Sequence, residues 1–212
     1  MTAATEGART VIVSGASSGI GEATARRFAR DGDAVVNLDV VVANAGISVR
    51  GGVLELTAER ARRTIEVNLL GVLALWHHAA RHLVAARSGV LLATASVNGL
   101  RGYPYYADYN ATKAGVVALT KSLALEWAPK VRVNAVCPGY VLTPMQEAEY
   151  TPQMLEEVNS RIPLGRHATP EEMAGLFAYL ASDEAAYFTG SVIVMDGGET
   201  AGSMVSAGGP GA

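Results

Sequence analysis

Short runs of apolar, β-branched residues alternate along this chain with longer stretches whose apolar residues recur at helical spacing. The short runs predict strands at 10–15, 33–39, 40–46, 89–96, 131–139 and 190–198. The longer stretches predict helices at about 20–31, 57–86, 109–128 and 170–181. Strands that alternate with helices are typical of parallel βαβ units. The pattern therefore predicts an α/β protein, a single domain over residues 1–212 with a doubly wound parallel sheet and helices on both faces.

Two segments depart from this alternation. Residues 140–168 are irregular and punctuated by prolines, which predicts a long loop. The runs 33–39 and 40–46 follow each other with neither a turn signal nor a helix between them. Parallel neighbours require a crossover of about a dozen residues or more. Taken literally, residues 34–43 are one long apolar strand, and the sheet loses a layer.

Composition limits the classes of partner. Half of the 212 residues are apolar and 17% are charged, below the ~25% of an average soluble domain, so apolar surface is expected to remain for subunit contacts. A net charge of −3 without a basic cluster argues against nucleic acid and against a membrane surface. No apolar run approaches the ~18 residues of a spanning helix, and the first ten residues lack a signal pattern.

The metal and redox signals are weak. Cys137 is the only cysteine, which excludes an internal disulfide and suits a cytoplasmic protein; we expect it to be a small buried hydrophobe. His78 and His82 have a spacing that two zinc ligands can use, but no third ligand lies nearby in the sequence. The sequence therefore predicts no metal site.

The first predicted strand ends in the glycine-rich turn SGASSGIG, which leads into the first predicted helix. Glycines in such a turn let the backbone bend tightly and approach a pyrophosphate, which the helix N-terminus stabilises. This context predicts a Rossmann-type dinucleotide site. Its residues in the turn are Gly15, Ser17, Ser18, Gly19, Ile20 and Gly21.

Two residues bear on the choice of dinucleotide. Asp39 lies eighteen residues after Gly21, at the predicted end of the strand 33–39. A carboxylate there would accept hydrogen bonds from the adenosine ribose and repel a 2′-phosphate. Ser18 stands before the second glycine, where an arginine or lysine would pair with that phosphate. Both features favour NAD(H) over NADP(H).

The segment YNATK places Tyr109 and Lys113 four positions apart in a predicted helix, so they share one face. Such a pair is also common on solvated surfaces. The chemical interpretation is that the ammonium group favours the phenolate and lowers the pKa of the tyrosine towards working pH.

Taken together and in order, these motifs resemble the short-chain dehydrogenase/reductase family over nearly the whole chain. The resemblance rests on SGASSGIG, on NAG at 44–46, on VNLLG with Asn68, on ATASVNG with Ser96, on YNATK thirteen residues later, and on CPGYVLTP and IPLGR. Each motif alone is unspecific, whereas their combination is specific.

The resemblance implies a role for each matching residue. Tyr109 would be the general acid or base, Lys113 would tune it and bind the nicotinamide ribose, and Ser96 would stabilise charge on the substrate oxygen. Asn68 would orient a water molecule that links the lysine to solvent. Further cofactor contacts are implied for Asn44, Ala45, Gly46, Pro138, Gly139, Val141 and Thr143. Residues 140–168 would contain the substrate lid, with Met145, Tyr150 and Met154 as pocket contacts.

The activity implied is hydride transfer between NAD(H) and a secondary alcohol or ketone of small or medium size. One alternative is an NADPH-dependent ketoreductase of the 3-oxoacyl or polyketide type. Another is a dinucleotide-binding regulator without turnover, which would have no need of Ser96, Tyr109 and Lys113 together. The family also implies a homotetramer, in keeping with the apolar helices at 57–86 and 109–128.

Measured against the family pattern, the chain lacks a helix, a strand and a second helix before NAG, roughly 40 residues by ordinary element lengths. The simpler hypothesis is that residues are missing from the sequence near 37–41. A step well beyond the ~3.8 Å between successive Cα atoms would mark the join. LDVVVANAG also resembles the start of the family's fourth strand, which would remove Asp39 from the second.

Overall fold

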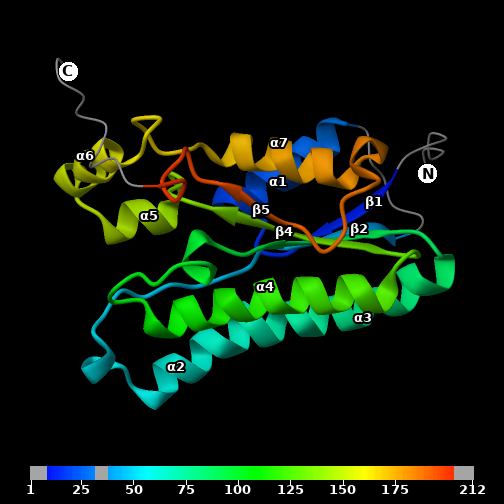
Figure 1. Ribbon diagram of the computed structural model, residues 1–212, viewed down its shortest axis with the longest axis horizontal. Helices are drawn as coiled ribbons and strands as arrows, with labels where there is room; N and C mark the ends of the chain where they lie inside the picture. The colour runs from blue at the N-terminus through cyan, green and yellow to red at the C-terminus, as the bar shows by residue number, and fades with distance from the viewer. Residues whose placement is uncertain (1–8, 32–37, 203–212) are drawn as a thin grey trace.

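The computed structural model describes residues 9–31 and 38–202 as one parallel sheet between two layers of helices (Figure 1). The strands lie in the order β1-β2-β3-β4-β5. Their bounds are Thr10–Val13 (β1), Leu38–Ala43 (β2), Val90–Thr94 (β3), Arg132–Pro138 (β4) and Val192–Met195 (β5). The helices are Gly19–Arg30 (α1), Ala58–Ile65 (α2), Gly71–Ala86 (α3), Ala107–Trp127 (α4), Pro144–Glu149 (α5), Pro152–Arg161 (α6) and Pro170–Ala181 (α7). The predicted α/β fold is confirmed.

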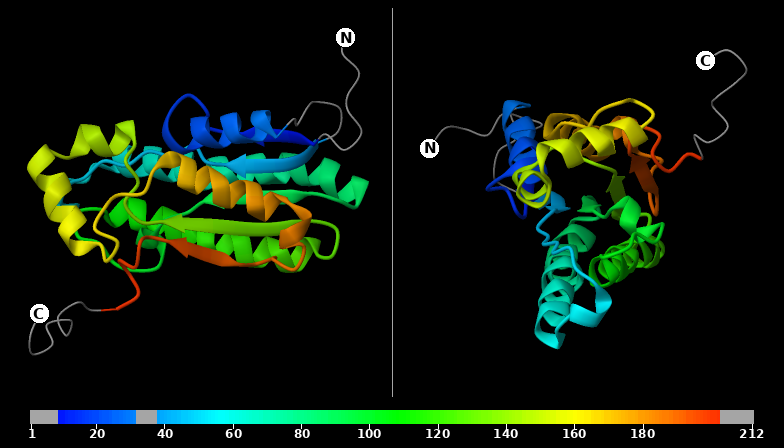
Figure 2. Two further views of the ribbon diagram at one scale, coloured as in Figure 1. Left: turned by 90° about the horizontal axis from the view of Figure 1, so that it is seen from above. Right: turned by 90° about the vertical axis from the view of Figure 1, so that its left-hand side faces the viewer.

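The two faces of the sheet bury separate cores. Helices α1 and α7 cover one face, and α3 and α4 cover the other (Figure 2). Alternate side chains of a strand point to opposite faces. Accordingly Val42 of β2 packs in the core that holds Phe28 of α1, while its neighbour Val41 packs in the core that holds Trp76 of α3. A strand buried on both faces reads as a continuous apolar run, as residues 40–43 of β2 do.

The predicted helix 57–86 is interrupted in the structure. Residues Glu66–Leu70 form a five-residue π turn between α2 and α3. Such bulges inside helices are rare and often lie at functional sites. Here the turn carries Asn68, which is fully buried. Apolar periodicity continues through the bulge, so the sequence pattern did not reveal it.

The expectation that residues 140–168 form an irregular loop is wrong in part, because α5 and α6 lie within them. Both helices begin with the pair Thr-Pro, as α7 does. The threonine hydroxyl accepts a hydrogen bond from the backbone N–H three residues later, and the proline occupies a helix position that needs no N–H donor. These prolines therefore start helices, where we had taken them to interrupt structure.

The boundary predicted between the strands 33–39 and 40–46 is wrong, whereas most of the first of these strands lies outside the described residues. Residues Leu38–Ala43 form one strand beside β1, and α1 is the crossover between them. Part of the first predicted strand, including Asn37 at the suspected join, lies outside the described residues. Asp39 therefore opens the strand that leads into Asn44, as the alternative interpretation of LDVVVANAG required.

The crossover through α1 has an unusual hand. In the left view of Figure 2, α1 and α7 face the viewer, the strands point to the left, and β1 lies above β2. The β1–α1–β2 connection is therefore left-handed, and so is the β4–α7–β5 connection on the same face, whereas the connections through α3 and α4 are right-handed. Right-handed connections make up about 98% of such units. Among the described residues, β1 is an edge strand with no neighbour beyond it.

The structure bears on three further expectations. Cys137 is buried, as predicted, and burial raises the pKa of its thiol to about 11. His78 and His82 are exposed, and no cluster that could hold a metal ion occurs among residues 9–31 and 38–202. In the same part of the chain, no helix has the length and apolarity that a membrane crossing requires.

Candidate active site

The carboxyl ends of the parallel strands meet at one edge of the sheet, and most predicted site residues follow directly from them. The glycine turn follows β1 and Asn44 follows β2. Ser96 lies two residues beyond β3, and Gly139 comes directly after β4. Because doubly wound proteins bind ligands outside the carboxyl ends of their strands, this edge is the candidate site.

The glycine turn is packed too closely for side chains at its key positions. Gly15 and Gly19 have φ values of +67° and +55°, a region that favours glycine. A Cβ atom at Gly21 would lie 2.2 Å from the carbonyl oxygen of Gly15. Ser18 is the N-terminal cap residue of α1, so the turn delivers the chain to the positive end of that helix. This arrangement fits a pyrophosphate group.

The segment 44–46 is tied to the glycine turn and to β3. The Oγ atom of Ser14 accepts hydrogen bonds from the N–H groups of Asn44 at 2.9 Å and Ala45 at 3.1 Å. The hydroxyl of Thr94 donates to the side-chain oxygen of Asn44 at 2.8 Å. These bonds hold three strand ends in one rigid arrangement.

Lys113 is buried beneath this edge, only 3% exposed. Its Nζ atom donates to the carbonyl oxygen of Thr94 at 2.7 Å and lies 5.5 Å from the centre of the Tyr109 ring. Burial lowers the pKa of this ammonium group to about 8. The helical spacing of four residues therefore does place the two side chains together, as predicted.

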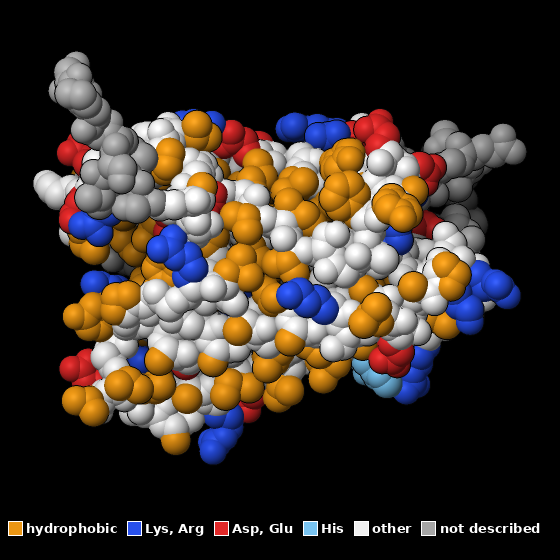
Figure 3. Space-filling model, viewed as in Figure 1, with side chains coloured by type: hydrophobic (Ala, Val, Ile, Leu, Met, Phe, Trp, Pro, Cys, Tyr) orange, Lys and Arg blue, Asp and Glu red, His pale blue; other side chains and the backbone are white. Residues whose placement is uncertain are grey.

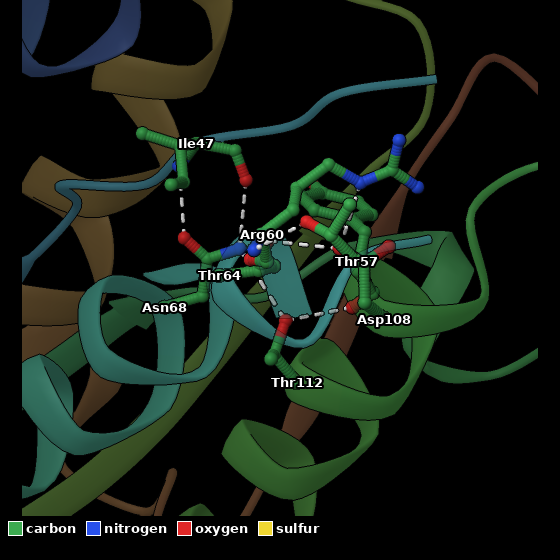
Figure 4. A network of polar contacts seen from close by, with 8 residues as sticks. Ile47, Thr57, Arg60, Thr64, Asn68, Asp108 and Thr112 are labelled. Atoms are coloured by element: carbon green, nitrogen blue, oxygen red, sulfur yellow. Dashed lines mark hydrogen bonds and ion pairs between the residues drawn. The ribbon is translucent and has the colours of Figure 1, made fainter. Parts of the chain in front are cut away.

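Asn68 holds the neighbouring segment in place (Figure 4). Its side-chain oxygen accepts from the N–H of Ile47, and its Nδ2 donates to the carbonyl oxygen of Ile47, both at 2.8 Å. Nδ2 also donates to Thr112 Oγ1 at 3.3 Å. The amide of Asn68 thus joins the π turn to α4 and to the chain that follows NAG.

Asp108 belongs to the same network. It is buried, and its carboxylate accepts from the hydroxyl of Thr64 at 2.9 Å. Arg60 lies 3.9 Å from the same carboxylate oxygen. Asp108 therefore anchors α2 against the start of α4, directly before Tyr109 (Figure 4).

Ser96 is held opposite Tyr109 by a chain of amide contacts. Its Oγ accepts from the N–H of Asn98 at 3.2 Å. The side chain of Asn98 donates to that of Asn110 at 2.7 Å, and Asn110 donates to the carbonyl oxygen of Tyr103 at 2.9 Å. The loop after β3 is thereby fixed to the first turn of α4, next to Tyr109.

Two cavities meet at Tyr109. The first, of about 370 Å³, is lined by most of the predicted cofactor residues. These are Gly15, Ser17, Ser18, Gly19, Ile20, Asn44, Ala45, Gly46, Tyr109, Lys113 and Thr143. Gly46 and Lys113 are neighbours in the wall of this cavity, because a Cβ atom on Gly46 would lie 3.6 Å from Lys113 Nζ. The residues present therefore fit the nicotinamide and pyrophosphate parts of a dinucleotide.

The second cavity, of about 100 Å³, is lined by Ser96, Tyr109 and Gly139 together with a group of tyrosines. It shares Tyr103, Tyr106, Tyr140 and Tyr150 with an outer cavity of about 540 Å³, which Met154 also lines. Tyr150 and Met154 were predicted as pocket contacts and line these cavities; the side chain of Met145 lies outside the described part. Burial raises the pKa of Tyr140 to about 12.

Three residues predicted to contact the cofactor do not line either of the two cavities that meet at Tyr109. Gly21 packs against the backbone of Gly15, Pro138 ends β4, and Val141 packs into the core with Phe177.

The prediction that Asp39 binds the adenosine ribose is wrong in this structure. Asp39 lies at the amino end of β2, and its carboxylate accepts from the N–H of Thr10 at 2.8 Å. Thr10 begins β1, whereas the glycine turn follows the other end of that strand. Because the two strands are parallel, Asp39 lies at the sheet edge opposite the candidate site.

Gln146 and Glu199 are among the pocket residues that escaped the sequence analysis. Gln146 lies on α5, and Glu199 lies in the turn DGGET after β5. Gly197 and Gly198 have φ values of +65° and +91°, and the carboxylate of Asp196 accepts from Gly198 N–H, which closes the turn. The glycine pair signalled the turn, but nothing local signalled the direction in which Glu199 points.

Comparison with known proteins places this geometry among oxidoreductases. The profile of the family described as enoyl-(acyl carrier protein) reductase matches residues 33–200. Cis-4-hydroxycyclohexanecarboxylate dehydrogenase of Sinomonas cyclohexanicum is 37% identical over 242 residues, which cover 91% of this chain and 97% of that protein. Since 91% of 212 residues is about 193, about 49 positions of that alignment have no residue from this chain.

Solved structures agree. An oxidoreductase of the short chain dehydrogenase/reductase family from Burkholderia thailandensis superposes with a TM-score of 0.88 at 31% identity, covering 94% of this chain and 96% of that one. A 4-hydroxyisoleucine dehydrogenase mutant, solved with NADH and succinate, gives a TM-score of 0.87 at 27% identity, covering 91% of this chain and 99% of that one.

Proposed function

The chain belongs to the short-chain dehydrogenase/reductase family of oxidoreductases, which act on CH–OH groups, and we propose that it transfers a hydride between NAD(H) and a secondary alcohol or ketone. One observation carries this proposal. Tyr109 lines both the cavity that fits a dinucleotide and the cavity that contains Ser96, while Lys113 lies beside it.

The proton steps belong to Tyr109. In reduction its hydroxyl donates a proton to the substrate oxygen, and in oxidation its phenolate accepts one. When a nicotinamide cofactor is bound, its ring supplies or accepts the hydride. The Oγ–H of Ser96 donates to the substrate oxygen and stabilises the negative charge that develops there.

Lys113 acts on Tyr109 through its charge. The ammonium group stabilises the phenolate, and the low dielectric of its buried position strengthens that interaction. Its place in the wall of the cofactor cavity also allows Nζ to donate to ribose hydroxyls. Asn68 holds the adjacent backbone in position; its implied role in ordering a water molecule remains a prediction.

Of the two residues that favoured NAD(H) over NADP(H) in the sequence, only Ser18 lies at the cofactor cavity. Ser18 lines the cofactor cavity at the point where a cation would pair with a 2′-phosphate, and Asp39 is remote from it. An NADPH-dependent ketoreductase is the second candidate, because a 3-oxoacyl-[acyl-carrier-protein] reductase of Thermotoga maritima is 42% identical over 162 residues. Rates with the two cofactors, each at equal concentration, separate these candidates.

We also propose a homotetramer. Leu70 at the end of the π turn is 50% exposed, and Leu125 of α4 is 85% exposed. Hydrophobic side chains are spread over both halves of the face shown in Figure 3. Exposed apolar surface of this kind favours contacts between copies. Light scattering at micromolar concentration tests it; a monomeric mass would exclude it.

The test of the activity is the change in nicotinamide absorbance with a panel of secondary alcohols and ketones. We expect turnover with at least one small or medium-sized member, at a higher kcat/KM with NAD(H) than with NADP(H). A folded protein that binds neither cofactor and turns over no member of the panel would refute the proposal.

A further inference from the structure

Two residues that line the inner cavity each carry a buried polar atom without a hydrogen-bond partner. Within the described part of the chain, Oε2 of Glu199 and Nε2 of Gln146 lack any partner. Both residues line the cavity that also contains Ser96 and Tyr109. Buried polar groups in native proteins are nearly always paired, and leaving one unpaired costs about 1–3 kcal/mol. An orphaned acceptor and an orphaned donor in one cavity therefore indicate a ligand that supplies both partners.

Glu199 is fixed in its position. Its other oxygen, Oε1, accepts from the hydroxyl of Tyr103 at 2.5 Å. A Cβ atom on Gly139 would lie 2.9 Å from Oε2, so the carboxylate lies close against Gly139. The cavity measures about 100 Å³, and Ser96 and Tyr109 line it as well. A group that contacts Oε2 from this cavity therefore shares a small space with the substrate atom held by Ser96 and Tyr109.

The pair of orphaned atoms selects among polar groups. A carboxylate would accept from Gln146 but would be repelled by Glu199. An ammonium group would donate to Glu199 but offers Gln146 no acceptor. A hydroxyl group donates one hydrogen bond and accepts others, so a single hydroxyl satisfies both atoms.

We propose that Glu199 and Gln146 form a subsite for a second hydroxyl group of the substrate, so that the substrate is a vicinal diol in oxidation and an α-hydroxy ketone in reduction. This inference rests on the proposed function and narrows its substrate class. The hydroxyl donates to Oε2 of Glu199 and accepts from Nε2 of Gln146, while the neighbouring oxygen is held by Ser96 and Tyr109. Neither residue takes part in the hydride or proton transfer.

The test compares 2,3-butanediol with 2-butanol, which differ by one hydroxyl group. A charged hydrogen bond contributes about 1.5–3 kcal/mol, so kcat/KM for the diol should exceed that for 2-butanol by about 10- to 100-fold. Glu199→Gln keeps the size of the side chain and removes its charge. We expect this variant to lose at least about 10-fold for the diol and to keep its rate with 2-butanol.

Two further variants make the result specific. Gln146→Met removes the donor and should lower the preference for the diol in the same way. Glu156→Gln is the matched control, because Glu156 is an exposed residue of α6 and lies outside the cavity lining; it should leave both rates unchanged.

Three outcomes overturn the subsite. They are equal kcat/KM for the two alcohols in the unmodified protein, an equal loss for both alcohols in Glu199→Gln, and a preference for 3-amino-2-butanol over the diol. In each case turnover persists and the proposed function stands. Turnover of neither alcohol, nor of any other member of the panel, would refute the function and the subsite together.

Discussion

The two halves of the dinucleotide site differ in how completely this chain builds them. On the side of β2, β3 and β4, Lys113, Asn44 and Ser96 are each held by hydrogen bonds to neighbouring strand ends or loops. On the side of β1, the described residues provide the glycine turn and no strand beyond it. The residues that would contact a nicotinamide group are all in place, so this half of the site is finished. An adenosine group would lie where the described residues provide no strand beyond β1, so this half is open.

The hand of the connection through α1 bears on this difference, although the connection through α7 in the other half is left-handed as well. If further strands followed α1 on the outer side of β1, the same helix would make a right-handed connection, the hand that most proteins adopt. The relative from Sinomonas cyclohexanicum carries about 49 aligned positions that this chain lacks, a length close to the roughly 40 residues of a helix, a strand and a helix. The location of those positions remains the prediction made for residues 37–41.

The largest expected effect lies in the finished half. Tyr109→Phe removes only the transferable proton, so kcat should fall by about 10²- to 10⁴-fold while the dissociation constant of NADH stays within a factor of about three. Fluorescence titration and steady-state kinetics measure the two quantities. Tyr187→Phe, at a fully exposed tyrosine, is the matched control. Near-normal rates in Tyr109→Phe would show that Tyr109 is not the general acid or base.

Lys113→Met should lower activity and yet stabilise the fold. Burial lowers the pKa of Lys113 from 10.5 to about 8, so holding it protonated costs roughly 3 kcal/mol below pH 8. The lost hydrogen bond to Thr94 offsets ~1 kcal/mol of that gain.

The pH dependence follows from the sign of this shift. The unfolded chain binds the proton up to higher pH, so the cost of Lys113 is complete below pH 8 and disappears as the pH rises towards 10.5. Urea unfolding should therefore show Lys113→Met more stable by about 1–2 kcal/mol at pH 7 and level with the unmodified protein near pH 10. Lys121→Met, at an exposed lysine of the same helix, should show neither effect. A loss of stability at pH 7 would contradict the argument.

Truncating the cofactor tests the open half. Reduced nicotinamide mononucleotide lacks the adenosine part, which meets no strand beyond β1 among the described residues. We expect kcat/KM with the mononucleotide to fall within about 10-fold of that with NADH, or less than ~1.4 kcal/mol. A loss of 10³-fold would show that the chain holds adenosine firmly and would remove the contrast between the halves.

The smallest effect is expected at Asp39. Asp39→Ala removes the acceptor for Thr10 N–H and should cost about 1–2 kcal/mol in the free energy of unfolding. The ratio of kcat/KM for NADH and NADPH should not change. Asp39→Asn keeps an acceptor oxygen and should cost less. A shift of preference towards NADPH in Asp39→Ala would instead support the original prediction that Asp39 binds the adenosine ribose.

The sequence by itself determined the sheet, its parallel strands and the local motifs, because apolar periodicity and glycine placement act over short distances. It also determined that Tyr109 and Lys113 lie together, since a separation of four residues fixes neighbours on one helix face. The helices α5 and α6 were readable from their Thr-Pro starts, although we took the prolines for loop signals.

Only the tertiary structure decided which strand contains Asp39, that Asn68 lies in a π turn, and that Glu199 and Gln146 reach the cavity of Ser96 and Tyr109. Each of these depends on contacts between segments far apart in the chain. A strand's register and end are set by the partner it pairs with, so LDVVVA has no fixed place until β1 lies beside it. The direction of Glu199 is likewise set by Tyr103 and Gly139, which no local pattern connects to it.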